Sequence, residues 1–121
     1  MKVLYTLLLA TAIVSCGDSQ RTVLYNKVMD VHDEVMPKMD DIFKHRKEFQ
    51  DKLATKPADS LDIRQKIARL DSADRMMMDW MHQFNPPDVK ASDEEAETYL
   101  EDQLTKVNAM KDYVLKALDQ K

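Results

Sequence analysis

Methionine and histidine are concentrated in two stretches of this chain, where together they have the chemistry to hold a soft metal ion. Nine of the 121 residues are methionine. In the first stretch Met29, His32, Met36 and Met39 are spaced by three, four and three residues, which places them on one face of a helix. Thioether sulfurs and imidazole nitrogens are ligands that suit Cu(I) or Ag(I).

The second stretch contains Met76, Met77 and Met78, followed by Met81 and His82. If the chain folds back on itself near residues 56 and 57, the two stretches meet, with Met36 opposite Met77 and His32 opposite Met81. The candidate ligands for Cu(I) are therefore Met29, His32, Met36, Met39, Met77, Met81 and His82.

Core packing is the competing interpretation of these methionines, and it is the one we expect. Methionine is a good helix former and fills irregular gaps between helices. Under this interpretation the protein needs no cofactor. Cu(I) is the expected cofactor only if the methionine and histidine cluster binds metal. A third interpretation is an exposed methionine-rich groove for a partner helix, because flexible thioethers suit adaptable surfaces.

Sequence motifs of known catalytic sites are missing from the chain. It has no Ser-His-Asp set, no His-Glu-x-x-His motif and no glycine-rich phosphate loop. Its one glycine is Gly17, so nothing after that position offers a glycine cradle for a nucleotide. We therefore expect the protein not to be an enzyme.

The first fifteen residues have the pattern of a secretory signal. Lys2 provides a short positive region, and residues 3–14 form an apolar run interrupted by Thr6 and Thr11. This run is too short to span a bilayer, which takes about 20 residues, but it has the length expected for the apolar region of a signal peptide.

The apolar run ends in Ile13-Val14-Ser15-Cys16, which resembles the lipobox of bacterial lipoproteins. The resemblance implies that residues 1–15 are a cleaved signal peptide and that Cys16 is acylated. Residues 16–21 would then be the lipidated cysteine and a tether, and residues 22–121 the helical domain. Cys16 is the only cysteine, so a disulfide framework and a cysteine-based zinc site are excluded.

The same resemblance predicts a place in the cell. Because Gly17 is not the aspartate associated with retention in the inner membrane, it implies a lipid anchor in the outer membrane. Such an anchor, with a short tether and long helices without a site, favours an interaction or structural role with another envelope protein as the partner. The composition also resembles small helical lipoproteins of Bacteroidota, a resemblance that implies no site residue. The net charge of −4 and the absence of a basic patch argue against nucleic acid as a partner.

Hydrophobic periodicity predicts three long helices separated by proline-containing breaks. With one glycine and four prolines, the chain has too few turn residues for a sheet protein. The first helix is expected over residues 21–54 with a kink near Pro37, the second to residue 84, and the third after a capping box at Ser92 and Glu95. Apolar residues recur every seven positions: Val28, Val35, Ile42, Phe49; Ile63, Leu70, Met77, Phe84; Leu100, Val107, Val114.

Short connections make neighbouring helices antiparallel, so we expect an all-α, up-down-up three-helix bundle with long helices. The alternative is a long helical hairpin or coiled coil that completes its core by dimerising. Asp74 falls on the apolar stripe of the second helix, where a leucine would be expected. It is either at the edge of a drifting stripe or a buried polar contact that fixes the register of the helices.

Overall fold

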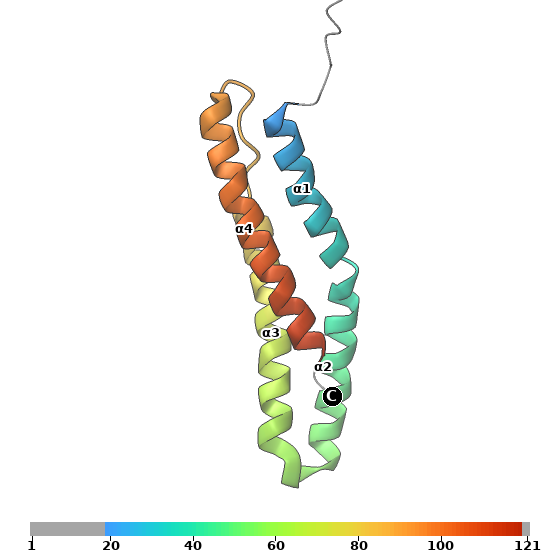
Figure 1. The fold of residues 1–121 in the computed structure, drawn as a ribbon. Helices are drawn as coiled ribbons and strands as arrows, with labels where there is room; N and C mark the ends of the chain where they lie inside the picture. Colours follow the sequence, from blue (N-terminus) through green and yellow to red (C-terminus); the bar gives the residue numbers. More distant parts are fainter. Residues whose placement is uncertain (1–18, 120–121) are drawn as a thin grey trace, which may run out of the picture.

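Four α-helices form three antiparallel arms, because α1 and α2 are the two halves of one bent arm (Figure 1). The computed structural model describes residues 19–119, and every regular element in that range is helical. The elements are α1 (Gln20–Val35), α2 (Lys38–Thr55), a short 3₁₀ turn (Pro57–Asp59), α3 (Ser60–Gln83) and α4 (Asp93–Leu118). The prediction of an all-α three-helix bundle is confirmed.

The bend between α1 and α2 lies at Met36 and Pro37. Pro37 has no N–H to donate to the carbonyl of Asp33, so the regular α-helical hydrogen bonds stop there. Both residues keep right-handed helical dihedral angles, and the Met39 N–H bonds to the Met36 carbonyl at 3.1 Å. The predicted kink is therefore present as a bend in one arm. Beyond it the packing changes, because α1 lies along α4 whereas α2 lies along α3.

The helix ends agree with the sequence in most places. Ser92 and Glu95 form the expected capping box at the start of α4. At the start of α1 the hydroxyl of Ser19 accepts a hydrogen bond from the Thr22 N–H. The helix therefore begins at Gln20, and the predicted tether is too long because Gln20 and Arg21 belong to α1. The proposed signal peptide and Cys16 lie outside the described residues.

The core is built on the predicted seven-residue repeats. Val28, Val35, Ile42 and Phe49 are buried along the bent arm, as are most members of the other two repeats. Helix α4 has a second buried row beside its seven-residue repeat, formed by Gln103, Met110 and Ala117. The residues that follow these in sequence, Leu104, Lys111 and Leu118, are only partly buried.

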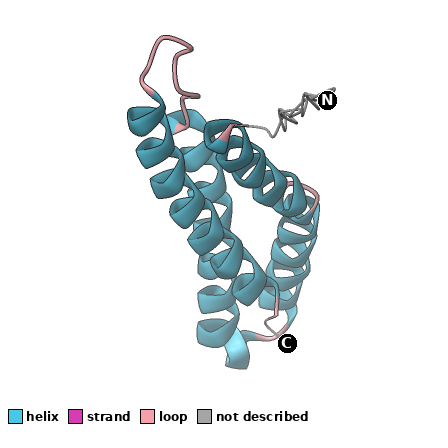
Figure 2. Cartoon of the chain, turned by 45° about the horizontal axis from the view of Figure 1, so that its top comes forward, coloured by secondary structure: helices cyan, strands magenta, loops and turns pink. Residues whose placement is uncertain are grey.

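The two ends of the bundle are built differently. At the loop end, the connection of residues 84–92 arches beyond α3 and α4 beside the start of α1 (Figure 2). At the turn end, the 3₁₀ turn joins α2 to α3, and this hairpin extends past the end of α4 (Figure 1). Leu24, Ala96 and Leu100 are buried outside the main core cluster of the bundle.

Candidate functional site

The seven candidate metal ligands are divided between the core and the surface. Met77 is fully buried, with 0% of its surface exposed, and Met39 packs against the same core. Met36 and Met81 are exposed at 38% and 37%. Met29 and His32 are half-buried, and His82 is exposed.

The predicted meeting of the two stretches depends on an unbroken first helix, which the structure does not have. Because α1 packs on α4, its backbone and that of α3 are not direct neighbours. His32 reaches across to α3, but it meets Trp80 rather than the predicted Met81, with ring centroids 5.7 Å apart. Aromatic rings therefore bridge α1 and α3 at this point.

These bridging rings form a row at the loop end of the bundle. Phe84 lies between Trp80, at 5.0 Å between ring centroids, and Tyr99, at 6.2 Å. Tyr25 of α1 lies 6.3 Å from the same phenylalanine ring. The Tyr99 hydroxyl also accepts a hydrogen bond from the Asn85 N–H at 2.9 Å. The row joins α1, α3 and α4 at the loop end of the bundle.

Trp80 is fixed in this row by a buried hydrogen bond. Its ring N–H donates to the side-chain oxygen of Gln103 at 3.1 Å, and both residues are buried. Since a buried indole N–H needs an acceptor, Gln103 satisfies it and keeps the ring in one orientation.

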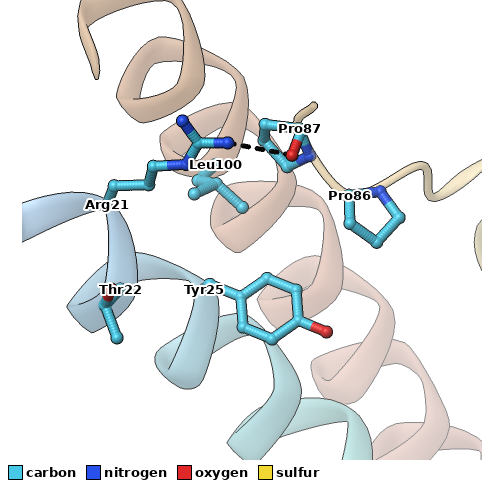
Figure 3. A pocket seen from close by; sticks show the side chains of 6 residues that line it. All are labelled: Arg21, Thr22, Tyr25, Pro86, Pro87 and Leu100. Atoms are coloured by element: carbon cyan, nitrogen blue, oxygen red, sulfur yellow. Dashed lines mark hydrogen bonds between the residues drawn. The ribbon is translucent and has the colours of Figure 1, made fainter. Parts of the chain in front are cut away.

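A small pocket opens between the first turn of α1 and the loop of residues 84–92 (Figure 3). The Arg21 guanidinium lies across its rim and donates to the carbonyls of Pro87 at 2.9 Å, Ala91 at 3.3 Å and Asp88. Tyr25 and Leu100 also line the pocket, whose volume is about 180 Å³. That is below the roughly 300 Å³ of a usual ligand site, so its clearest role is structural. Arg21 ties the loop to α1.

Asp74 sits at the edge of its stripe, on the side of α3 that faces α2. Its side chain is 43% exposed, and a carboxylate oxygen lies 3.9 Å from the Arg46 guanidinium nitrogen Nη1. The same nitrogen donates to Asp71 at 2.9 Å. The stripe position next to Asp74 is filled by the fully buried Ala73. Asp74 is therefore a partly exposed neighbour of an arginine that links α2 to α3.

A second ion pair links the other half of the arm to α4. Lys111 donates to a Glu34 carboxylate oxygen at 2.6 Å, with the two side chains 25% and 50% exposed. Both partners lie beside rows of buried apolar residues, so the pair closes the edge of the α1–α4 contact. Lysine reaches this position because its aliphatic stem can cover apolar surface.

The sequence did not predict the contacts that three side chains make, those of Arg21, Arg46 and Gln103. The spacing of Gln103, Met110 and Ala117 by seven residues carried a signal for the second buried row of α4. No comparable pattern marks Arg21 or Arg46, because each acts on residues distant in sequence.

Two kinds of feature are absent from the residues that the structure describes. Between residues 19 and 119, no three or more His, Cys, Asp or Glu side chains are grouped so that they could hold a metal ion. In the same range, no helix combines the length and apolar character needed to cross a membrane. The absence of a metal-binding group concerns His, Cys, Asp and Glu alone and does not bear on the methionine thioethers.

Comparison with known proteins adds no assignment. The chain matches no protein-family model, no curated protein and no solved structure. Its function must therefore be argued from its own residues.

Proposed function

We propose that this chain is the precursor of a bacterial envelope lipoprotein, anchored through Cys16, whose helical bundle is a non-catalytic structural or interaction domain. The observation that carries the proposal is the position of the only cysteine. It ends the apolar run at Ile13-Val14-Ser15-Cys16, where a lipobox requires it. Three acyl chains, at about 0.8 kcal/mol per buried methylene, would hold such a protein durably in a membrane.

The start of α1 supports a close attachment. Because Ser19 caps a helix that begins at Gln20, only three residue steps separate the bundle from Cys16. At roughly 3.5 Å per residue, that span reaches at most about 10 Å. The proposed anchor would thus keep the start of α1 next to the lipid surface.

The anchor would also orient the bundle. Arg21 binds three carbonyls of the loop of residues 84–92, so this loop shares the end of the bundle nearest the proposed anchor. The turn of residues 57–59 lies at the opposite end (Figure 1). At about 1.5 Å per residue, the 24 residues of α3 would carry this turn up to about 36 Å from the membrane. The bundle would present long helix faces to other envelope proteins in between.

Lipid labelling tests the anchor. We expect the wild-type chain, expressed in a bacterial host with labelled palmitate, to take up label and sediment with membranes. Cys16→Ser should lose the label, because the hydroxyl cannot form the thioether that carries the lipid. Ser15→Ala is the matched control and should keep the label, because alanine is also small. An unlabelled wild-type protein, or label retained in Cys16→Ser, would contradict the proposal.

The interaction role needs a separate readout in the same cells. After treatment with a lysine-reactive crosslinker, the wild-type protein should form a defined heavier adduct. The adduct should be lost with Cys16→Ser, which removes the protein from its place in the membrane. A chain that runs only as the monomer in both cases would rule out a stable partner and leave a purely structural role.

A further inference from the structure

One face of α1 keeps a histidine and two methionines together after the bend has separated the rest of the predicted cluster. Met36 follows the last residue of α1, yet its dihedral angles are helical and its N–H bonds to the His32 carbonyl at 2.9 Å. His32 and Met36 are therefore true helical neighbours, with Cβ atoms about 5–6 Å apart. Met29 lies three residues before His32 on the same face. Met39 lies beyond the bend and packs against the core.

The His32 ring is held as a metal-binding imidazole would be. Its Nδ1 lies 2.9 Å from a carboxylate oxygen of Asp33. Because an ionised carboxylate can only accept, this contact requires a hydrogen on Nδ1, which in the neutral ring leaves the lone pair on Nε2. A carboxylate behind the imidazole is the usual support of a histidine ligand, since it fixes the ring and raises its basicity. The side chain is 16% exposed, so it is sheltered but open to solvent.

Trp80 backs this histidine with a fixed aromatic face. The two rings are tilted by 35° at 5.7 Å, and the indole is itself held by Gln103 and by stacking on Phe84. A fixed neighbour reduces the ordering cost of binding an ion at His32. A cation close to an indole face also gains from the ring's negative quadrupole, most strongly with tryptophan.

The charges around these turns of α1 are nearly balanced, because Lys27 and Lys38 flank the stretch that carries the acidic residues. Asp30 and Asp33 are exposed on the same turns, and the carboxylate of Glu34 is neutralised by Lys111. One imidazole and two thioethers form a soft, low-charge ligand set, which suits a monovalent d¹⁰ ion rather than zinc or magnesium.

We propose that Met29, His32 and Met36 form a binding site on α1 for a soft monovalent metal ion, Cu(I) or Ag(I). The site draws on three of the seven residues that the sequence suggested. Met77 is closed in the core, and Met81 and His82 belong to α3, whose backbone is not a direct neighbour of α1. The inference goes beyond the lipid anchor and does not depend on it.

Silver titration of the full chain carrying Cys16→Ser, in mild detergent, tests this site. The substitution removes the only thiol, which would otherwise bind silver, and makes the result independent of lipidation. Trp80 is the only tryptophan, so its emission reports directly on an ion at His32. In chloride-free buffer we expect silver nitrate to quench this emission, saturating at one ion per chain, with Kd tighter than about 10 µM. Weaker or non-saturating quenching would overturn the proposal.

Matched variants distinguish this site from silver bound elsewhere. His32→Phe keeps a ring against Trp80 but removes the nitrogen ligand, and Met36→Leu replaces an exposed thioether by a side chain of similar size. Each should weaken binding by at least about tenfold. His82→Phe and Met78→Leu make the same changes at exposed positions on α3 and should leave Kd within about twofold.

Two results would assign silver to general methionine chemistry and overturn the proposal. One is an equal loss of affinity in the α3 controls, and the other is unchanged affinity in Met36→Leu. Equilibrium dialysis with direct measurement of bound silver provides a readout that does not depend on the tryptophan. Circular dichroism verifies that each variant keeps its helices.

Discussion

The two halves of the bent arm bury one apolar stripe against different helices of the bundle. A single repeat of Val28, Val35, Ile42 and Phe49 is buried along both halves. Before Pro37 this stripe packs on α4, and after Pro37 it packs on α3. The bend at the proline therefore allows one continuous apolar stripe to pack against α4 on one side of the bend and against α3 on the other.

The difference extends to the polar chemistry beside each half. Next to α2, the bundle is closed by the guanidinium of Arg46 on Asp71. Next to α1, it is closed on one side by Lys111 with Glu34 and on the other by the contact of His32 with Trp80. Each half carries a half-buried imidazole and a half-buried thioether, His32 with Met29 in α1 and His45 with Met39 in α2, but it is His32 whose ring meets Trp80 of α3.

The largest predicted effect comes from the same truncation in two places. Leu70 and Leu100 are both fully buried, but only Leu70 belongs to the main core cluster, and Leu100 borders the open pocket at Arg21. We expect each leucine-to-alanine substitution to lower the free energy of unfolding by about 2–5 kcal/mol, with Leu70→Ala the more damaging. The space beside Leu100 can relax or admit water more easily.

Urea unfolding followed by circular dichroism measures both values. A single transition is expected for each variant, because the buried repeat runs through both halves. If Leu100→Ala splits the curve into two transitions, the halves unfold independently, and the idea of one shared stripe is wrong.

A smaller effect is expected from the buried hydrogen bond that fixes the ring row. Gln103→Ala leaves the Trp80 ring N–H buried without its acceptor, which should cost about 1–3 kcal/mol in the free energy of unfolding. Adding Trp80→Phe removes that unpaired donor, so the loss in the double variant should be smaller than the sum of the two single losses. Strict additivity in this double-mutant cycle would show that the hydrogen bond contributes nothing measurable.

The smallest effects are expected at the two ion pairs that link the helices. Arg46→Met and Lys111→Met each remove a partly exposed pair, and each should cost less than about 1 kcal/mol. The loss should shrink in high salt, because screening weakens the pair already in the wild-type protein. Lys47→Met, which removes the exposed pair with Asp51 within α2, is the control and should cost less still. A salt-independent loss at Arg46 would point to packing of its aliphatic stem instead.

Most of the fold was readable from the sequence because local rules determine it. Seven-residue repeats, the capping box at Ser92 and the prolines gave the three arms, the bend and the start of α4. These features act within one helix, where periodicity and backbone chemistry decide the outcome. The start of α1 was misplaced by a residue or two because its cap, Ser19, lies in a polar segment whose composition also suits a flexible tether.

The candidate site was harder to predict because it depends on which helices touch. Pairing residues across the first turn assumed a straight arm and placed Met81 opposite His32, where the structure has Trp80. The contact of Arg46 with Asp71 joins residues 25 positions apart. The burial of Gln103 was not predicted, because a polar side chain interrupts the apolar pattern of the second buried row of α4. Such contacts follow from the bend and from packing, which no single segment specifies.

The measurement that tests the proposed anchor most directly is the mass of the protein extracted from membranes of a bacterial host. The account predicts a chain that begins at Cys16 and carries the added mass of acyl groups on its first residue. A protein that retains residues 1–15, or one that begins at Cys16 with no added mass, would contradict the lipid anchor.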